Sequence, residues 1–530
     1  MSPRKIARPA PRGTDHVPIR KLTTGVPGLD EILGGGLPEY SFNIIAGAPG
    51  SGKTTLAHQI VFANASIARP ALYFTVLGEP AIKMLRYQQQ FTFFDLAKID
   101  GALRFVNLSQ IVLNNDLGVV LDRIVKEVES SQAKMVVVDS FRTVVRKAQS
   151  ASTEMDLQAF IQRLALHLTS WQATTFLMGE YVEGELRDNP VFTVADGLFW
   201  LHQSIERNSI VRKLQIMKLR GQESVPGLHT FRITESGLQC FPRTFGLRSM
   251  EHFAKGRRRL STGVPELDAL MGGGIPEGDS VLIGGPSGAG KSVLASQFIA
   301  AGLRRGESAV ATIFEEIPSE YIARGDQFGF DFSRAERERR LQVIYLRPLD
   351  LSVDETVHEI VSVVRQIECK RLVIDSLVGF EMALAPGFRA EFRESLYRMI
   401  TALSRLGVTI VSTVEINENF TSMGLTNYAI SFLADDILRL RYVSISGQLR
   451  KLLIVVKMRR TRHSIDIYGY EITPKGLVVH EALRGYRALA SCIPGPWAFV
   501  TQEAPVLGEE PPKRLGAPAR PAKPKGRRHG

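Results

Sequence analysis

The sequence has little of what disulfide-rich, zinc-binding or membrane proteins need. Its three cysteines, Cys240, Cys369 and Cys492, lie far apart and form no CxxC pair, which excludes a disulfide framework and a cysteine zinc site. No apolar run approaches the roughly 18–20 residues that span a bilayer. The basic first residues contain no apolar segment typical of a secretory signal. We therefore expect a cytoplasmic protein in a reducing compartment, with no membrane partner.

Acidic residues are too few to balance the basic ones, and the formal net charge is +12. The excess is concentrated in three segments, 1–21, 241–259 and 508–530, and the rest of the chain carries a small negative charge. A nucleic-acid-binding domain carries its basic residues on the folded surface. The distribution therefore disfavours nucleic acid as a partner, although it does not exclude a local basic groove.

An internal repeat decides the domain organisation. Residues 22–39 read LTTGVPGLDEILGGGLPE and residues 260–277 read LSTGVPELDALMGGGIPE, identical at twelve of eighteen positions with an offset of 238. A repeat held in register over some two hundred residues indicates two homologous domains. We place the domains at 18–245 and 260–490, with a basic linker at 246–259 and disordered ends at 1–17 and 491–530.

Each half alternates short apolar runs with amphipathic stretches. The runs that we expect to be buried strands are 42–47, 71–76, 134–140 and 173–179 in the first half, and 280–285, 309–314, 371–377 and 408–413 in the second. Strands separated by helical patterns are typical of a mostly parallel sheet with helices on both faces. The sequence therefore predicts the α/β class, with one such sheet in each half.

Both halves carry the pattern GxxxxGK[ST] between a strand and a helix, the P-loop that cradles nucleotide phosphates. Its glycines let backbone N–H groups point inward at phosphate oxygens, and its lysine contacts the β- and γ-phosphates. The ATP-binding residues that it predicts are Gly47, Gly50, Ser51, Gly52, Lys53 and Thr54 in the first half, and Gly285, Gly288, Ala289, Gly290, Lys291 and Ser292 in the second. Two matches at equivalent positions argue against an ordinary glycine-rich turn.

A carboxylate ends one buried strand in each half, at Asp139 and Asp375. An aspartate after four apolar residues is costly to place unless water, a metal or a donor meets it. With the hydroxyls of Thr54 and Ser292, these residues are the predicted ligands of Mg²⁺. A helix-capping role is the alternative for the aspartates.

The two halves differ where a hydrolytic carboxylate is expected. Glu315 and Glu316 follow the second strand of the C-terminal half, where they could orient the attacking water and Glu315 could also approach Mg²⁺. Leu77 and Gly78 occupy these positions in the N-terminal half, with Glu79 one place further on. We predict that the C-terminal site hydrolyses ATP with Lys291 and these glutamates, and that the N-terminal site turns ATP over slowly. A solvated pair of strand-end glutamates is the alternative.

Both halves also carry a Lys-x-Arg pair after a later strand, Lys218 with Arg220 and Lys457 with Arg459. Cations of this kind neutralise the charge that develops on a transferring γ-phosphate, often from a neighbouring subunit. Action in trans would require a ring or a filament. The alternative is a charged strand end that faces solvent. Glu180 and Glu415, after the fourth strand of each half, are further polar candidates.

Together these motifs resemble the KaiC family of RecA-like ATPases, over about residues 18–490. The resemblance implies two RecA-like P-loop domains and a homohexameric double ring with ATP between subunits. It implies that Lys218, Arg220, Lys457, Arg459 and His463 contact ATP across the interface. It further implies a serine/threonine autokinase and signalling through a KaiB-like or two-component partner.

The sequence departs from this family in two respects. The glutamate pair is absent from the N-terminal half, and the Ser-Thr pair that is autophosphorylated in the clock proteins falls on Ser431 and Phe432, with Thr426 nearby. Ser431 is therefore the phosphorylation site that the resemblance predicts, and a two-site cycle is disfavoured. A RecA-like DNA-handling ATPase and a nucleotide-gated scaffold remain alternatives to a signalling ATPase.

Overall fold

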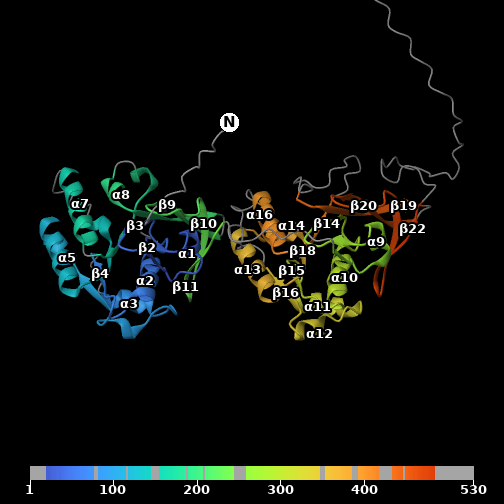
Figure 1. Cartoon of the computed structure of the whole chain (residues 1–530), viewed down its shortest axis with the longest axis horizontal. Helices are drawn as coiled ribbons and strands as arrows, with labels where there is room; N and C mark the ends of the chain where they lie inside the picture. Colours follow the sequence, from blue (N-terminus) through green and yellow to red (C-terminus); the bar gives the residue numbers. More distant parts are fainter. Residues whose placement is uncertain are drawn as a thin grey trace, which may run out of the picture.

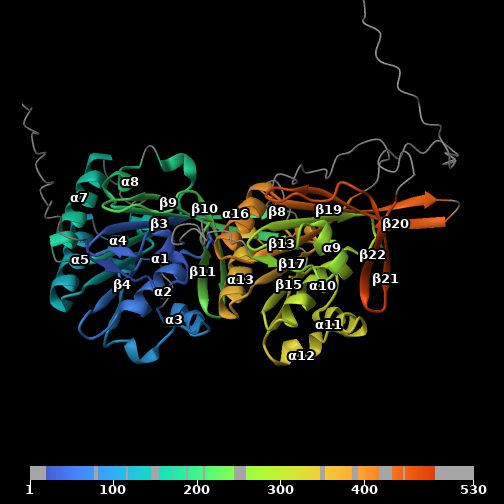
Figure 2. The ribbon, with the colours of Figure 1, turned by 45° about the vertical axis from the view of Figure 1, so that its right-hand side comes forward.

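The computed structural model describes most of the two halves of the chain. The residues described are 19–76, 81–114, 117–144, 154–170, 172–186, 189–206, 209–243, 258–346, 352–384, 392–416, 433–445 and 448–483. Two similar α/β domains lie next to each other along the long axis of the molecule (Figures 1 and 2). Within the described residues, no helix is long and apolar enough to cross a membrane.

The N-terminal domain is built on a nine-stranded sheet in the order β11-β10-β9-β8-β3-β7-β6-β4-β5. The strands from β8 to β5 in this order pair in parallel, and β9, β10 and β11 pair in antiparallel fashion. Their bounds are β3 Phe42–Gly47, β4 Ala71–Thr75, β5 Leu103–Asn107, β6 Met135–Asp139, β7 Thr174–Gly179, β8 Gly197–Glu206, β9 Ser209–Leu219, β10 Leu228–Thr234 and β11 Gly237–Phe241. The longer helices are α2 Lys53–Asn64, α3 Ala81–Gln88, α5 Leu117–Ser131 and α7 Glu154–Ser170.

The C-terminal domain repeats this architecture with the order β16-β15-β17-β18-β14-β19-β20-β21-β22. Its strands are β14 Ser280–Gly285, β15 Ala309–Ile313, β16 Leu341–Tyr345, β17 Arg371–Asp375, β18 Thr409–Glu415, β19 Asp436–Ile445, β20 Gln448–Met458, β21 Tyr468–Thr473 and β22 Gly476–Ala482. Its longer helices are α10 Lys291–Leu303, α11 Pro318–Gln327, α13 Val353–Gln366 and α16 Phe392–Arg405. The predicted α/β class, with two mostly parallel sheets that carry helices on both faces, is confirmed.

Alternation along the parallel strands separates two hydrophobic cores in each domain. In β6, Met135 and Val137 pack with α2 on one face, while Val136 and Val138 pack with α5 and α7 on the other. Successive side chains of a strand point to opposite faces, so a strand covered on both faces reads as a continuous apolar run. This is why the strands were visible in the sequence, and it assigns a face to each residue at a strand end.

Ion pairs join the two domains. Arg232 of β10 bonds to Glu355 of α13 at 2.7 Å, and Arg243 bonds to Glu394 of α16 at 3.1 Å. Arg398 of α16 donates to the carbonyl oxygen of Arg243 at 2.8 Å. The last strands of the N-terminal domain therefore rest on two helices of the C-terminal domain.

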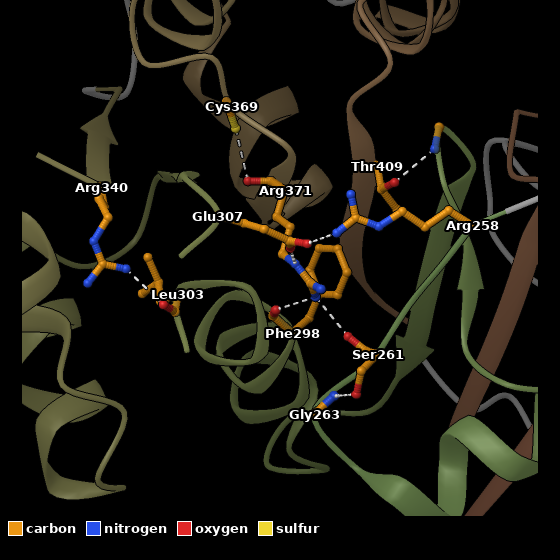
Figure 3. A network of polar contacts seen from close by, with 11 residues as sticks. Arg258, Ser261, Gly263, Phe298, Leu303, Glu307, Arg340, Cys369, Arg371 and Thr409 are labelled. Atoms are coloured by element: carbon orange, nitrogen blue, oxygen red, sulfur yellow. Dashed lines mark hydrogen bonds and ion pairs between the residues drawn. The ribbon is translucent and has the colours of Figure 1, made fainter. Parts of the chain in front are cut away.

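A buried arginine anchors the start of the C-terminal domain (Figure 3). The side chain of Arg371, at the beginning of β17, is 0% exposed and donates to Glu307 at 2.7 Å. It also donates to the carbonyl oxygens of Ser261 and Phe298, at 2.7 and 2.8 Å. Arg258, the first residue of the linker that the structure describes, pairs with the same Glu307 at 2.6 Å. The chain leaving the linker is thus tied to the strand that ends in Asp375.

Candidate nucleotide sites

The two P-loops share one backbone conformation. Each begins at the last residue of the central strand, β3 or β14, and ends at the second residue of α2 or α10. Gly50 and Gly52 have φ angles of 74° and 102°, and their counterparts Gly288 and Gly290 have 74° and 93°. Only glycine adopts such angles without strain, so the glycines are what allow the loop to curl. The residues from Gly47 to Thr54 and from Gly285 to Ser292 lie where the sequence predicted an ATP-binding loop.

The P-loop lysines lie over the loops that precede them. Lys53 Nζ donates to the carbonyl oxygens of Gly47 and Ala48, at 3.0 and 2.8 Å. Lys291 Nζ donates to Pro286 at 2.8 Å. Burial lowers the pKa of both ammonium groups, and neighbouring carboxylates oppose this shift. An anion bound in the loop would stabilise the ammonium charge in place of the water lost on burial. This environment suits a lysine that binds phosphate.

The predicted magnesium ligands of the N-terminal domain come together. Thr54 Oγ1 donates to Asp139 Oδ2 at 3.2 Å, and Tyr73 Oη donates to the same oxygen at 2.9 Å. Burial raises the pKa of Asp139, while the two hydroxyl donors and Lys53 act against this rise. A hydroxyl and a largely buried carboxylate beside a phosphate loop are the oxygen ligands that suit Mg²⁺, so these residues fit the ion. In the C-terminal domain, Asp375 accepts a hydrogen bond from Thr413 of β18.

Strand alternation places the acidic candidates on the P-loop face of each sheet. Val373 of β17 and Val411 of β18 pack in the core that contains α10, and Asp375 and Glu415 follow each of them by an even number of residues. Glu415 pairs with Gly285, the first residue of the P-loop. The carboxyl ends of adjacent parallel strands meet at one edge of a sheet, so these carboxylates surround Lys291.

The structure distinguishes the two glutamates that follow β15. Glu315 accepts a hydrogen bond from Ser376 Oγ at 3.0 Å, next to Asp375, and it is one of the carboxylates that support the charge of Lys291. Glu316 instead pairs with Arg324 of α11 at 2.7 Å. Burial raises the pKa of Glu316, and Arg324 opposes this rise. Glu315 is therefore the better placed of the two to act on a bound nucleotide.

Several predicted residues lie outside the part of the chain that the structure describes. They are Leu77 and Gly78, the counterparts of the glutamate pair, Glu79 after them, and Ser431 and Thr426, the candidate phosphorylation sites. The asymmetry between the two sites therefore still rests on the sequence at these positions.

The Lys-x-Arg pairs lie at the opposite edge of each sheet from the P-loop of the same domain. Arg220 bonds to Asp196 at 3.2 Å, and the amide of Asp196 donates to Phe42, the first residue of β3. The P-loop begins after Gly47, at the far end of this six-residue strand, about 17 Å away. Lys218 Nζ donates to the carbonyl of Thr193 at 3.0 Å, at the same edge of the sheet as Arg220. The pair cannot reach the P-loop of its own domain.

The C-terminal pair repeats this geometry. Arg459 bonds to Asp435 at 3.1 Å, and the amide of Asp435 donates to Ser280, the first residue of β14. Lys457 Nζ donates to the carbonyl of Ala434 at 2.7 Å. Half-buried His463 lies in the connection between β20 and β21, four residues after Arg459. Lys457 and Arg459 therefore lie at the edge of the sheet away from the P-loop of their own domain.

Sequence reasoning missed two residues of the N-terminal site. Tyr73 holds Asp139 from the strand β4, and Arg142 contacts the segment after β7. In the sequence, Tyr73 looks like one more apolar strand residue. The pairing of β4 with β6 sets Thr75 beside Asp139, and this register brings Tyr73, two residues earlier in β4, within reach of the carboxylate. Arg142 follows Asp139 by three residues and carried no motif.

Comparison with known proteins gives one consistent result. A family model described as "ATPase: KaiC" matches residues 22–244 and again residues 260–484. The chain is 28% identical over 492 residues to the circadian clock oscillator protein KaiC of Picosynechococcus sp., covering 90% of this chain and 92% of the relative. It is 29% identical over 490 residues to KaiC 1 of Synechocystis sp., with the same coverage. It is 27% identical over 496 residues to KaiC of Synechococcus elongatus, covering 91% of this chain and 93% of the relative.

Proposed function

Because the chain belongs to the KaiC family and carries an ATPase domain of that family in each half, we propose that it is an ATP-hydrolysing switch whose C-terminal site is the more active. The observation that carries this proposal is the cluster of Lys291, Asp375 and Glu315 at the end of the C-terminal P-loop. The N-terminal P-loop is equally well formed, but the sequence places Leu77 and Gly78 where the second glutamate pair would stand.

The C-terminal residues divide the work of hydrolysis among them. The amides of the loop from Gly285 to Ser292 bind the phosphates, and Lys291 places its charge on the β- and γ-phosphates. Glu315, held by Ser376, orients a water molecule and accepts its proton. Ser292 and Asp375 would hold Mg²⁺, which supplies further neutralisation of phosphate charge when it is bound.

We further propose that the chain forms a ring, in which the cations at the opposite edge of each sheet contact the nucleotide of a neighbouring subunit. Arg220 and Arg459 lie about one strand length from the P-loop of their own domain, so they can serve only a neighbouring nucleotide. A heterologous contact of this type, P-loop edge against cation edge, generates a ring where the rotation closes and a filament where it does not. We therefore propose a homohexamer with ATP at the subunit interfaces, as the family resemblance implied.

Steady-state hydrolysis with single-site variants tests the assignment. We expect Lys291→Ala to lose most of the turnover and Lys53→Ala to keep most of it, because the glutamate pair after the second strand is present only in the C-terminal half. The double variant Glu315→Gln/Glu316→Gln should also lose most of the activity. Near-normal turnover in that double variant, together with loss in Lys53→Ala, would contradict the proposal. Native mass spectrometry with and without ATP measures the oligomer.

The same incubation tests autophosphorylation and the DNA-handling alternative. We propose Ser431 as the acceptor, so intact mass should rise by one phosphate in wild type and not in Ser431→Ala. Turnover without added mass would leave an ATPase switch that is read through its nucleotide state by a protein partner. Salt-dependent DNA binding that stimulates turnover would instead favour the hypothesis of a RecA-like DNA-handling ATPase.

A further inference from the structure

Glu180 directly follows β7, the strand that pairs with β3 beside the N-terminal P-loop. We propose that this site hydrolyses ATP slowly, and that Glu180 is the residue that orients the attacking water there. This inference rests on the proposed function and assigns a catalytic residue to its less active site. It replaces the carboxylate that the aligned positions Leu77 and Gly78 cannot supply.

The position of Glu180 follows from the pairing of β7 with β3. Ala46 of β3 pairs with Gly179 of β7 in parallel register, so Glu180 comes level with Gly47, where the P-loop begins. Phe176 and Met178 of β7 pack in the core that contains α2. Alternation continues this face to Glu180, which therefore lies on the side of the sheet that carries the P-loop and Lys53.

Electrostatics and exposure agree with this placement. Glu180 supports the charge of Lys53 more strongly than Asp139 does. Lys53 itself is held over Gly47 and Ala48 by two hydrogen bonds, so the carboxylate and the ammonium share the mouth of one loop. Glu180 is exposed, so water has access to it. Asp139, by contrast, is largely buried beneath Tyr73 and Thr54, which suits a metal ligand rather than a base.

Arg142 fixes the backbone from which Glu180 projects. Its guanidinium donates to the carbonyl oxygen of Glu180 and binds Glu185 through two nitrogens, at 2.7 and 2.8 Å. It also lies over the ring of Tyr181, 5.1 Å from the centroid. Arg142 is three residues beyond Asp139, and the corresponding residue after Asp375 is Val378. Arg142 is therefore a positioning residue that belongs to the N-terminal site alone.

The proposed step is a direct hydrolysis. The oxygen of the water forms a bond to the γ-phosphorus while the bond from that phosphorus to the β,γ-bridging oxygen breaks, which leaves ADP and inorganic phosphate. Glu180 accepts the proton that the water loses and returns it to phosphate or solvent. The C-terminal site has Glu415 level with its own P-loop and Glu315 in addition, which explains why the N-terminal site is the slower.

A full-length chain carrying Lys291→Ala isolates the N-terminal site. In that background we would measure release of labelled phosphate for Glu180→Gln and for a matched control, Glu79→Gln, the glutamate that follows Leu77 and Gly78 in the sequence. We expect Glu180→Gln to lower the rate about 10²-fold and Glu79→Gln to leave it within about 3-fold. Binding of a fluorescent ATP analogue should change by less than about 3-fold in both, which shows that the site is folded.

Arg142 gives a second, independent test. Arg142→Met should lower kcat in the same background and leave nucleotide affinity unchanged, since Arg142 acts on Glu180 and not on the phosphates. Arg142→Lys should restore part of kcat, because an ammonium still donates to the carbonyl of Glu180. A purely structural role would instead lower affinity and thermal stability together.

Two outcomes would overturn the inference and leave the proposed function intact. One is a Lys291→Ala rate no higher than that of Lys53→Ala/Lys291→Ala, with Lys53→Ala still active; the N-terminal site then does not hydrolyse ATP. The other is a rate lost in Glu79→Gln and kept in Glu180→Gln. If Lys53→Ala rather than Lys291→Ala abolishes bulk turnover, the proposed function fails, and Glu180→Gln still tests this residue.

Discussion

Replacing Arg371 with methionine should destabilise the C-terminal domain selectively. Arg371 is the first residue of β17, and Met135 is the first residue of the corresponding strand β6, so the fold accepts methionine at this position. The change leaves Glu307, whose side chain is only 8% exposed, with Arg258 as its remaining partner. It also removes the donor to the carbonyl oxygens of Ser261 and Phe298.

The magnitude follows from the burial of the ion pair. Removing one partner of a buried pair costs about 3–5 kcal/mol, because the other charge stays in a poorly solvated site. Replacing both partners with apolar residues is often close to neutral. We therefore expect Arg371→Met to lower the free energy of unfolding of the C-terminal domain by about 3–5 kcal/mol, and Arg371→Met/Glu307→Met to recover most of that loss.

Urea denaturation with two optical probes separates the domains. Trp200 is buried in β8, so in a chain that carries Trp171→Phe and Trp497→Phe its fluorescence reports the N-terminal domain, whereas circular dichroism at 222 nm reports both domains. The variant should shift the part of the dichroism change that belongs to the C-terminal domain to lower urea and leave the Trp200 transition in place. A shift below about 1 kcal/mol, or a double variant less stable than the single one, would refute the reasoning.

Three further predictions concern the sites. Burial lowers the pKa of His58 to about 4, against 6.5 in the unfolded chain, so its contribution to stability is complete above pH 6.5 and is lost as the pH falls to 4. His58→Leu should therefore reduce the loss of N-terminal stability between pH 6.5 and pH 4 by about 3 kcal/mol, measured by Trp200 fluorescence in urea; an unchanged pH dependence would contradict this. Tyr73→Phe removes a donor to Asp139 and should lower the apparent affinity for Mg²⁺ about tenfold, measured as the Mg²⁺ concentration that half-saturates nucleotide binding in the Lys291→Ala chain. Equal Mg²⁺ titrations of the two chains would count against that role. Glu315→Gln should lower wild-type turnover about 10²-fold while Glu316→Gln lowers it less than about 3-fold, and the reverse order would show that the strand-end geometry was misread.

The fold class and the phosphate loops could be predicted from the sequence because both depend on local chain chemistry. Strands such as β3 and β17 are covered on both faces, so they appear as continuous apolar runs. The P-loops need glycine where the backbone takes positive φ, and that requirement is written directly in the sequence. Because the two halves are repeats of one another, each strand or loop predicted in one domain could also be predicted at the aligned position of the other.

The choice between Glu315 and Glu316 depended on tertiary structure. Both residues follow the same strand and are adjacent in the sequence, so no local pattern separates them. Only the packing of α11 brings Arg324 to Glu316, and only the parallel pairing of β15 with β17 brings Ser376 near Glu315.

The sequence by itself predicted two P-loop domains, the candidate ATP-binding residues and the acidic strand ends. Tertiary structure decided which of these groups meet: Tyr73 and Asp139 come together across β4 and β6, and Arg142 reaches the carbonyl of Glu180. It also placed Arg220 and Arg459 at the edge of the sheet opposite their own P-loops. The physical reason is that strand order and register depend on how segments far apart in the sequence pack their apolar faces together, whereas a motif records only its own neighbours along the chain.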